Sequence, residues 1–197
     1  MIIPKKQLNK ENLLSHGVQL LMQQGYHGTG LKEILDAVQI PKGSFYNYFS
    51  SKESFAAEVI QHYIAPFIGQ LDNHLQKPDI DALTALKNYF NELIVELEKA
   101  QFKGGCLLGN LMGEIGDTSA LCQKSLQLAV GRYRDLLATG LKKAQMEGSV
   151  RVDKSADDMA DLLVNTWQGA LLRMKIEQSA EPLKQCCHDL LDDYFKD

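Results

Sequence analysis

The chain has no long apolar run. Its 197 residues contain no uninterrupted apolar stretch longer than three residues, whereas a membrane-spanning helix needs about 20. The first six residues turn polar at once and lack the apolar centre of a secretory signal. We therefore expect a cytoplasmic protein without a membrane partner.

Cysteines are few, and their spacing suits neither a metal site nor a disulfide framework. The four are Cys106, Cys122, Cys186 and Cys187. They do not form the paired spacing of a zinc site, and two adjacent cysteines make a poor intramolecular disulfide. In a cytoplasmic chain we read all four as thiols, and we predict no metal and no cofactor.

A general excess of basic charge is also missing. The formal net charge is -4, which argues against a non-specific nucleic-acid binder. The average hides an asymmetry, because residues 1–55 hold six lysines and four acids while the remainder carries a net charge of -6. Attraction to phosphate is therefore confined to the N-terminal quarter.

Strand-like alternation is absent, and every periodic segment repeats at helical spacing. We therefore predict an all-α fold. The expected helices are one that ends before Gly25, then 31–38, 41–48, 51–75, 80–101, 105–115, 119–146, 155–177 and a last one from Pro182.

Several helix starts can be assigned from capping residues. Pro66 lies inside the fourth expected helix and should kink or split it, because proline removes a backbone hydrogen bond and clashes with the preceding turn. The predicted caps are Gly30 with Glu33, Ser50 with Glu53, and Ser155 with Asp158.

The short third helix is the most informative segment. At helical spacing Phe45 and Phe49 share one face, and Ser44, Asn47 and Tyr48 share another. The aromatic face would pack on the two preceding helices and leave the polar face outward. A helix-turn-helix needs this arrangement to place one helix in the DNA major groove.

The polar side chains of this segment suit defined DNA contacts. Lys42 and Lys52 stand near helix starts and could contact phosphates. Gly43 removes a side chain where backbone approaches DNA or a neighbouring helix. Asn47 can pair with adenine through two hydrogen bonds, whereas Ser44 discriminates less between bases.

These residues resemble the TetR family of bacterial repressors over roughly residues 10–55. The match consists of Gly25-Tyr26, then Thr29, the run from Ile40 to Phe49, and Lys52-Glu53. The resemblance implies a helix-turn-helix head at residues 1–52 and a helical ligand-sensing and dimerisation body at 53–197, with about nine helices in all. The DNA contacts it implies are Thr29, Lys42, Gly43, Ser44, Tyr46, Asn47, Tyr48 and Lys52.

The resemblance further implies a homodimer through the last two helices, a ligand pocket in the body, and binding to a pseudo-palindromic operator. The alternative for Tyr46 and Tyr48 is that they only pack the small head.

Cys106 is the second informative feature. It follows two glycines and opens a helix, where backbone N–H groups and the helix dipole favour a thiolate. The segment resembles that of TetR-family repressors that respond to N-ethylmaleimide and other electrophiles, which implies that Cys106 is the sensor and that Lys175 assists it. The alternatives are that Cys106 is a small apolar packing residue and that Lys175 is solvated or salt-bridged.

A non-covalent inducer would need a pocket in the body. An aromatic and methionine set at helical spacing could line one, although such sets belong to the core more often than to a ligand wall. The candidates are Phe90, Met112, Tyr133, Trp167 and Met174, with Arg173 as an anion partner.

The sequence thus favours a DNA-binding regulator. We expect a repressor that is released from its operator by a small molecule or by modification of Cys106. A thiol enzyme is a different class, but no histidine with an orienting acid accompanies Cys106, so we predict no enzyme. A purely structural helical adaptor would leave the polar face of residues 44–48 unexplained.

Overall fold

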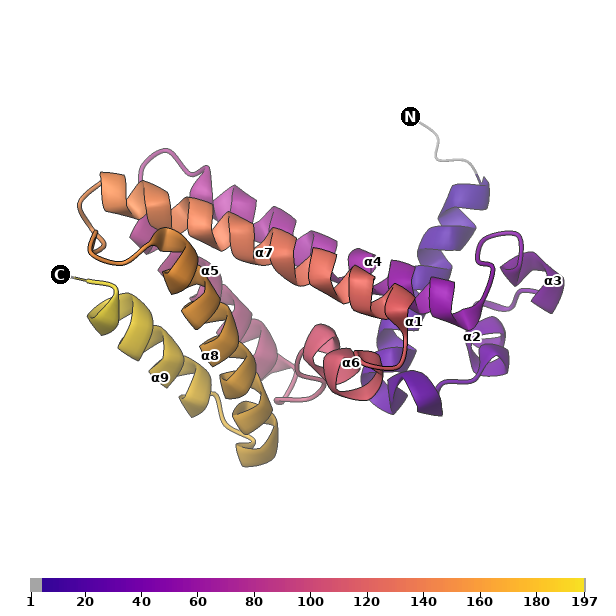
Figure 1. Ribbon diagram of the computed structural model, residues 1–197. Coiled ribbons are helices and arrows are strands. Elements are labelled where there is room, and N and C mark those ends of the chain that lie inside the picture. The colour runs from indigo at the N-terminus through magenta and orange to yellow at the C-terminus, as the bar shows by residue number, and fades with distance from the viewer. Residues whose placement is uncertain (1–4, 197) are drawn as a thin grey trace. The chain divides into compact units, whose positions relative to one another are not determined.

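The computed structural model describes residues 5–196, which form nine α-helices, a π-helical continuation of the last, and no strand (Figure 1). The all-α prediction is confirmed. The helices are α1 Lys5–Gly28, α2 Leu31–Val38, α3 Lys42–Phe45, α4 Lys52–Leu75, α5 Ala82–Lys99, α6 Leu107–Ile115, α7 Ala120–Met146, α8 Ala156–Glu177 and α9 Glu181–Cys187, which continues as His188–Tyr194.

Every helix in residues 5–196 is too short or too polar to cross a membrane. Residues 1–4, which contribute to the expectation that no secretory signal opens the chain, lie outside the described residues.

The described residues form two compact units. The first contains residues 5–65 and 106–130, and the second contains residues 66–105 and the chain from residue 131 onward. The sequence placed the division at the start of α4, after residue 52. The structure instead groups α6 and the first part of α7 with the N-terminal helices, because these segments contact one another.

The capping predictions are confirmed at α2 and α8. The Glu33 carboxylate accepts the Gly30 N–H at 2.9 Å, and the Ser155 hydroxyl accepts the Asp158 N–H at 3.0 Å. Both contacts satisfy an N–H group that has no partner within its own helix.

The cap predicted for α4 is wrong by one residue. Ser51, rather than Ser50, precedes the first helical residue, and its hydroxyl accepts the Ser54 N–H at 3.0 Å. The Ser54 hydroxyl in turn accepts the Ser51 N–H at 3.0 Å. The reciprocal pair is therefore two serines, because the turn before α4 runs one residue further than the sequence pattern indicated.

Pro66 does not split α4, which runs unbroken from Lys52 to Leu75. The boundary between the two compact units nevertheless falls between Ala65 and Pro66. The residue that cannot donate a helical hydrogen bond thus marks where α4 passes from one unit to the other.

The third helix is shorter than predicted. Only Lys42–Phe45 are α-helical, and the chain then continues in tight turns in which the Asn47 and Tyr48 N–H groups bond three residues back. Glycine and asparagine are weak helix formers, so the expected helix over 41–48 is reduced to one turn. The Phe49 N–H still bonds to the Phe45 carbonyl at 3.0 Å, which keeps the two rings together.

The cores of the two units differ in composition. In the first, Phe45, Phe49 and Phe55 form a cluster with ring centroids 5.0–5.6 Å apart. In the second, Phe90 and Trp167 meet edge to face at 4.8 Å, and Tyr89 contacts Phe90 at 5.2 Å. The first cluster joins α3 to α4, the next helix along the chain, and the second joins α5 to α8, so each fixes how its helices pack.

Candidate nucleic-acid interface and thiol site

The aromatic face of the α3 segment is buried, as the sequence predicted, since Phe45 and Phe49 are 0% and 2% exposed. The opposite side faces outward. It comprises the exposed Lys42, Gly43, Tyr46 and Asn47 and the half-buried Ser44 and Tyr48. A short segment therefore presents a cation, an amide, a hydroxyl and two phenols on one side. Groups of these types can contact phosphates and base edges.

Gly43 is not required by packing inside the chain. A Cβ at this position would meet no heavy atom of the described residues within 4 Å. The sequence predicted that the backbone at Gly43 approaches either DNA or a neighbouring helix, and the second alternative is therefore excluded. The small residue leaves room on the outer surface, where DNA would approach.

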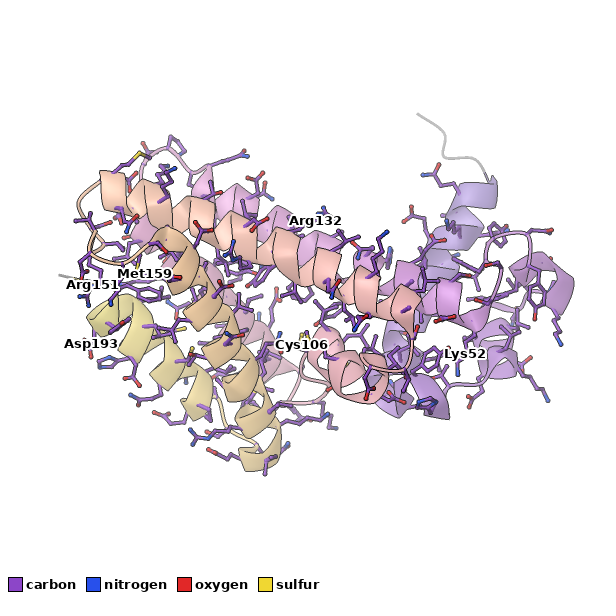
Figure 2. The ribbon with its side chains drawn as sticks, viewed as in Figure 1. Lys52, Cys106, Arg132, Arg151, Met159 and Asp193 are labelled. Atoms are coloured by element: carbon purple, nitrogen blue, oxygen red, sulfur yellow. The ribbon has the colours of Figure 1, made fainter. Side chains whose placement is uncertain are left out.

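The structure directs Thr29 and Lys52 inward. Thr29 is fully buried, and its hydroxyl donates to the Gly25 carbonyl at 2.7 Å. Lys52 lies beside the end of α1 (Figure 2), donates to the Tyr26 carbonyl at 2.6 Å and lies 4.2 Å from the centre of the Tyr26 ring. The Thr29 hydroxyl is therefore buried away from a phosphate, whereas the half-buried Lys52 amine has one donor bonded to Tyr26; both side chains contact the turn between α1 and α2.

An acid on α6 completes this turn. The two carboxylate oxygens of Glu114 accept the N–H groups of Tyr26 and His27 at 2.7 and 2.6 Å. No local sequence pattern predicts this contact of Glu114, because its partners lie 88 and 87 residues away along the chain.

Further polar contacts tie α4 to the start of α7. Ser119 donates to the Glu53 carboxylate and also caps α7 by accepting the Cys122 N–H at 3.1 Å. The buried Ser125 donates to the Ala57 carbonyl at 2.6 Å, and the Gln61 amide donates to Ser125 Oγ at 2.9 Å. These contacts explain why residues 106–130 group with the N-terminal helices.

Burial shapes the protonation of this polar region. Partial burial raises the pKa of the Tyr26 phenol, helped by the neighbouring Cys122 and Glu53. Partial burial also lowers the pKa of Lys52, while the nearby Glu114 carboxylate acts in the opposite direction. The attraction between Glu114 and Lys52 thus favours a charged lysine between α1 and α4.

Cys106 occupies the N-cap position of α6, as the sequence predicted, and is half-buried (Figure 2). The segment before it has unusual backbone geometry, because φ is positive at Gln101, Phe102, Gly104 and Gly105. The methylene chain of Lys175 lies 3.8 Å from the position that a Cβ would take on Gly105. Lys175 itself is exposed.

The other three thiols are less suited to reaction. Burial raises the pKa of Cys122, of Cys186 to about 11 and of Cys187 to about 12. Since the thiolate is the reactive form, these cysteines react slowly near neutral pH.

The predicted pocket residues fall in different places. Phe90, Trp167 and Met174 are buried in the second unit, where Phe90 and Trp167 pack together. Tyr133 belongs to the same unit and contacts Tyr89 with ring centroids 6.3 Å apart. The structure therefore brings most of the aromatic set together in one core.

Met112 and Arg173 lie elsewhere than expected. Met112 is in the first unit and lines an open groove of about 540 Å³ with residues such as Leu126 and Val130. Arg173 is exposed and pairs with Glu177 on its own helix at 2.9 Å, so its guanidinium already has an anionic partner on the surface.

One face of α8 exposes apolar side chains. Leu162, Leu172 and Ile176 are 39%, 56% and 82% exposed, and the exposed Gly169 lies between them. Their spacing follows a heptad pattern along the helix. Figure 1 shows α9 running beside α8 in the opposite direction, and the two are in contact.

The ligand atoms of His188, Asp189 and Asp193 lie within 4.8 Å of one another. All three side chains are exposed, and such acidic clusters are common on protein surfaces without an ion.

Comparisons with known proteins agree with this architecture. The family described as "Bacterial regulatory proteins, tetR family" matches residues 13–59, and the domain described as "Tetracyclin repressor-like, C-terminal domain" matches residues 82–190. The chain is 34% identical over 176 residues to the HTH-type transcriptional repressor DhaR of Mycobacterium sp. (strain GP1), covering 89% of this chain and 87% of that protein.

A second relative is the HTH-type transcriptional repressor NemR of Escherichia coli (strain K12), at 30% identity over 175 residues, 89% of this chain and 88% of NemR. The crystal structure of the reduced form of E. coli NemR superposes with a TM-score of 0.84 over 90% of this chain and 92% of that one. These relatives are transcriptional regulators and not enzymes. Because one family description matches more than half of the chain, the chain belongs to the TetR family of bacterial regulatory proteins.

Proposed function

We propose that this chain is a dimeric transcriptional repressor of the cytoplasm that binds a pseudo-palindromic operator and is released from it by an inducer. The observation that carries the proposal is the α3 segment, in which exposed polar side chains surround a buried pair of phenylalanines. In a dimer, two such segments would enter successive major grooves about 34 Å apart.

The proposed DNA contacts are a subset of those expected from sequence. They are Lys42, Gly43 through its backbone, Ser44, Tyr46, Asn47 and Tyr48. Asn47 is the residue best suited to read a base, because its exposed amide can donate and accept at an adenine edge. Thr29 and Lys52 act indirectly, since both hold the turn that precedes α2.

The proposed dimer interface is formed by α8 and α9. The exposed stripe of Leu162, Leu172 and Ile176 supports it, because apolar side chains exposed along one face of a helix often mark a protein–protein interface. The exposed Gly169 would let the helices of two subunits approach closely.

We further propose that modification of the Cys106 thiol by an electrophile or oxidant releases the operator. Its N-cap position on α6 supports this role, because the helix dipole there favours a thiolate. The methylene chain of Lys175 lies against Gly105, the residue that precedes Cys106 in the chain.

The rival inducer is a small organic molecule that binds without covalent chemistry. The aromatic group of Phe90, Tyr133 and Trp167 in the second unit favours a flat apolar ligand if the core opens to admit it.

One experiment tests the function and separates the two inducers. Bound sequences are selected from random DNA, and operator affinity is then measured with and without N-ethylmaleimide. We expect a palindromic sequence to be selected and the reagent to release it. Cys106→Ser should retain the operator after treatment, whereas the matched control Cys187→Ser should still release it. If Cys106→Ser is released as readily as the wild type, covalent sensing at this thiol is wrong.

A further inference from the structure

We propose that Glu114, on α6, is a positioning residue that holds the helix-turn-helix in the arrangement that binds DNA. The inference rests on the proposed function, because it assumes that the α3 segment contacts the operator. It assigns to that function a residue outside the DNA-binding segment recognised from sequence.

The first observation is that α1 breaks at Gly25. The backbone there has φ 73° and ψ 178°, and the helix resumes for one further turn, Tyr26–Gly28. The N–H groups of Tyr26 and His27 are therefore the first of a new turn and lack the helical carbonyl that a continuous helix would offer. Glu114 supplies one carboxylate oxygen to each, at 2.7 and 2.6 Å.

The second observation is the closeness of this contact. A Cβ on Gly25 would lie 2.7 Å from Glu114 Oε2, so a larger residue would push the carboxylate out of its present position. The positive φ requires glycine here, and the missing side chain leaves room for the carboxylate. A side chain from α6 and a backbone break in α1 fit each other.

The third observation is that the same peptide group is held from its other side. Lys52 on α4 donates to the Tyr26 carbonyl at 2.6 Å, so α6 and α4 together fix the Tyr26 backbone. Three residues after Tyr26, the Thr29 hydroxyl donates back to the Gly25 carbonyl, and α2 begins at Leu31. The direction of α2, and of the α3 segment packed on it, therefore depends on Glu114.

Charge supports a positioning role over a direct one. A carboxylate near a DNA-binding segment repels phosphates, so its loss should by itself strengthen DNA binding. If a variant that removes this charge binds DNA more weakly, it has lost the orientation of the helix-turn-helix that binds DNA.

The position of Glu114 on α6 connects its contact with the turn after Gly25 to the thiol of Cys106. Cys106 is the N-cap of α6 and Glu114 lies near its C-terminal end, about 12 Å further along at the rise of an α-helix. A shift of α6 caused at Cys106 would move the carboxylate away from the Tyr26 and His27 N–H groups. Loss of those bonds would release the turn that orients α2.

The test compares Glu114→Gln with Asp117→Asn. Both variants remove one negative charge with little change of shape, and Asp117 is an exposed acid three residues away in the same unit. The glutamine can accept only one of the two N–H groups and turns an NH₂ donor toward the other. Affinity is measured on the selected operator over a range of salt concentrations, with thermal unfolding to verify that each variant is folded.

We expect Glu114→Gln to weaken operator binding about tenfold with the same dependence on salt as the wild type, because no phosphate contact is lost. Asp117→Asn should bind as tightly as the wild type or slightly more tightly. If Glu114→Gln binds like Asp117→Asn, the inference is overturned.

Hydrogen exchange provides a readout that needs no DNA. The Tyr26 and His27 amides should exchange at least about tenfold faster in Glu114→Gln than in the wild type, and unchanged exchange would also overturn the inference. A wild-type chain that selects no DNA sequence contradicts the proposed function instead, and the exchange rates still decide whether Glu114 holds this turn.

Discussion

Each compact unit has an aromatic cluster, and different contacts join the helices around each cluster. In the first, directional hydrogen bonds join helices far apart in the sequence, as Glu114 does to Tyr26 and Ser125 does to Ala57. In the second, Phe90 packs on Trp167 between α5 and α8, and a hydrogen bond from the Ala82 N–H to the Glu147 carboxylate also joins remote segments. A hydrogen bond has one good geometry and is lost when a helix shifts by an ångström or so, whereas apolar contacts adapt to small movements.

The comparison suggests a division of labour between the units. Apolar burial supplies most of the stability of any domain, through Phe45, Phe49 and Phe55 in the first unit and through Phe90 and Trp167 in the second. The polar contacts of the first unit contribute less free energy each but define a particular arrangement of α1, α4, α6 and α7. An arrangement defined in this way can be switched without unfolding the protein.

The largest change in the free energy of unfolding is expected from removing an aromatic side chain from the core of the second unit. Trp167→Ala leaves a cavity against Phe90 and should lower the free energy of unfolding by about 3–5 kcal/mol. Urea denaturation followed by circular dichroism measures this loss. Met146→Ala, at a side chain that is 75% exposed, is the control and should stay within about 0.5 kcal/mol of the wild type. A small effect of Trp167→Ala would mean that packing does not dominate the second unit.

A second prediction separates binding from stability. Asn47→Ala removes an exposed amide and should weaken operator binding by about 1–3 kcal/mol, the value of one bidentate base contact, while unfolding stays unchanged. Asn88→Ala, at an exposed asparagine of α5, should alter neither. Equal operator binding by Asn47→Ala and the wild type would contradict the proposed base contact.

A third prediction concerns the buried hydrogen bonds of the first unit. Ser125→Ala removes a buried hydroxyl that serves both Ala57 and Gln61 and should cost about 1–2 kcal/mol of folding free energy. Combining it with Gln61→Ala should cost less than the two single changes together, because they share one hydrogen bond. Strict additivity in denaturation experiments would show that the Gln61 contact contributes nothing.

The smallest change in folding free energy is expected from a helix cap in the second unit. Asp81 caps α5 by accepting the Thr84 N–H at 2.9 Å, and its hydrogen bonds with the Thr84 hydroxyl and N–H lower its pKa below 3.8. A lowered pKa in the folded state means that the stabilisation is present above pH 3.8 and lost as the pH falls through the lower value.

Asp81→Ala should therefore cost about 1 kcal/mol at neutral pH and almost nothing in strong acid. Denaturation at several pH values measures the difference, with the exposed Asp79→Ala as control. A difference that persists in strong acid would show that the carboxylate charge is not its source.

Much of this architecture could be predicted from the sequence. The order of helices, the buried Phe45–Phe49 pair and the caps at Glu33 and Ser155 all depend on residues within one helical turn of each other. Local spacing records such contacts directly. The family resemblance of the N-terminal segment was readable for the same reason.

Two of the features that the sequence did not predict are contacts between remote segments, whereas the length of α3 and the cap of α4 are local errors. Nothing near Lys52 in the sequence indicates that its amine turns toward Tyr26 instead of outward. Glu114 was invisible as a functional residue because its partners belong to another helix. The length of α3 was overestimated, since side-chain periodicity persists through tight turns that are no longer α-helical.

The left-handed backbone at Gln101 and Phe102 stores conformational energy between α5 and α6. Such a conformation costs a non-glycine residue on the order of 1–3 kcal/mol, and the Gln101 and Phe102 N–H groups hold it by bonding to the Glu98 and Leu97 carbonyls at 2.9 Å. Breaking these two bonds would remove what offsets that cost. The conformation of the connection that leads into Cys106 therefore depends on an intact C-terminal end of α5.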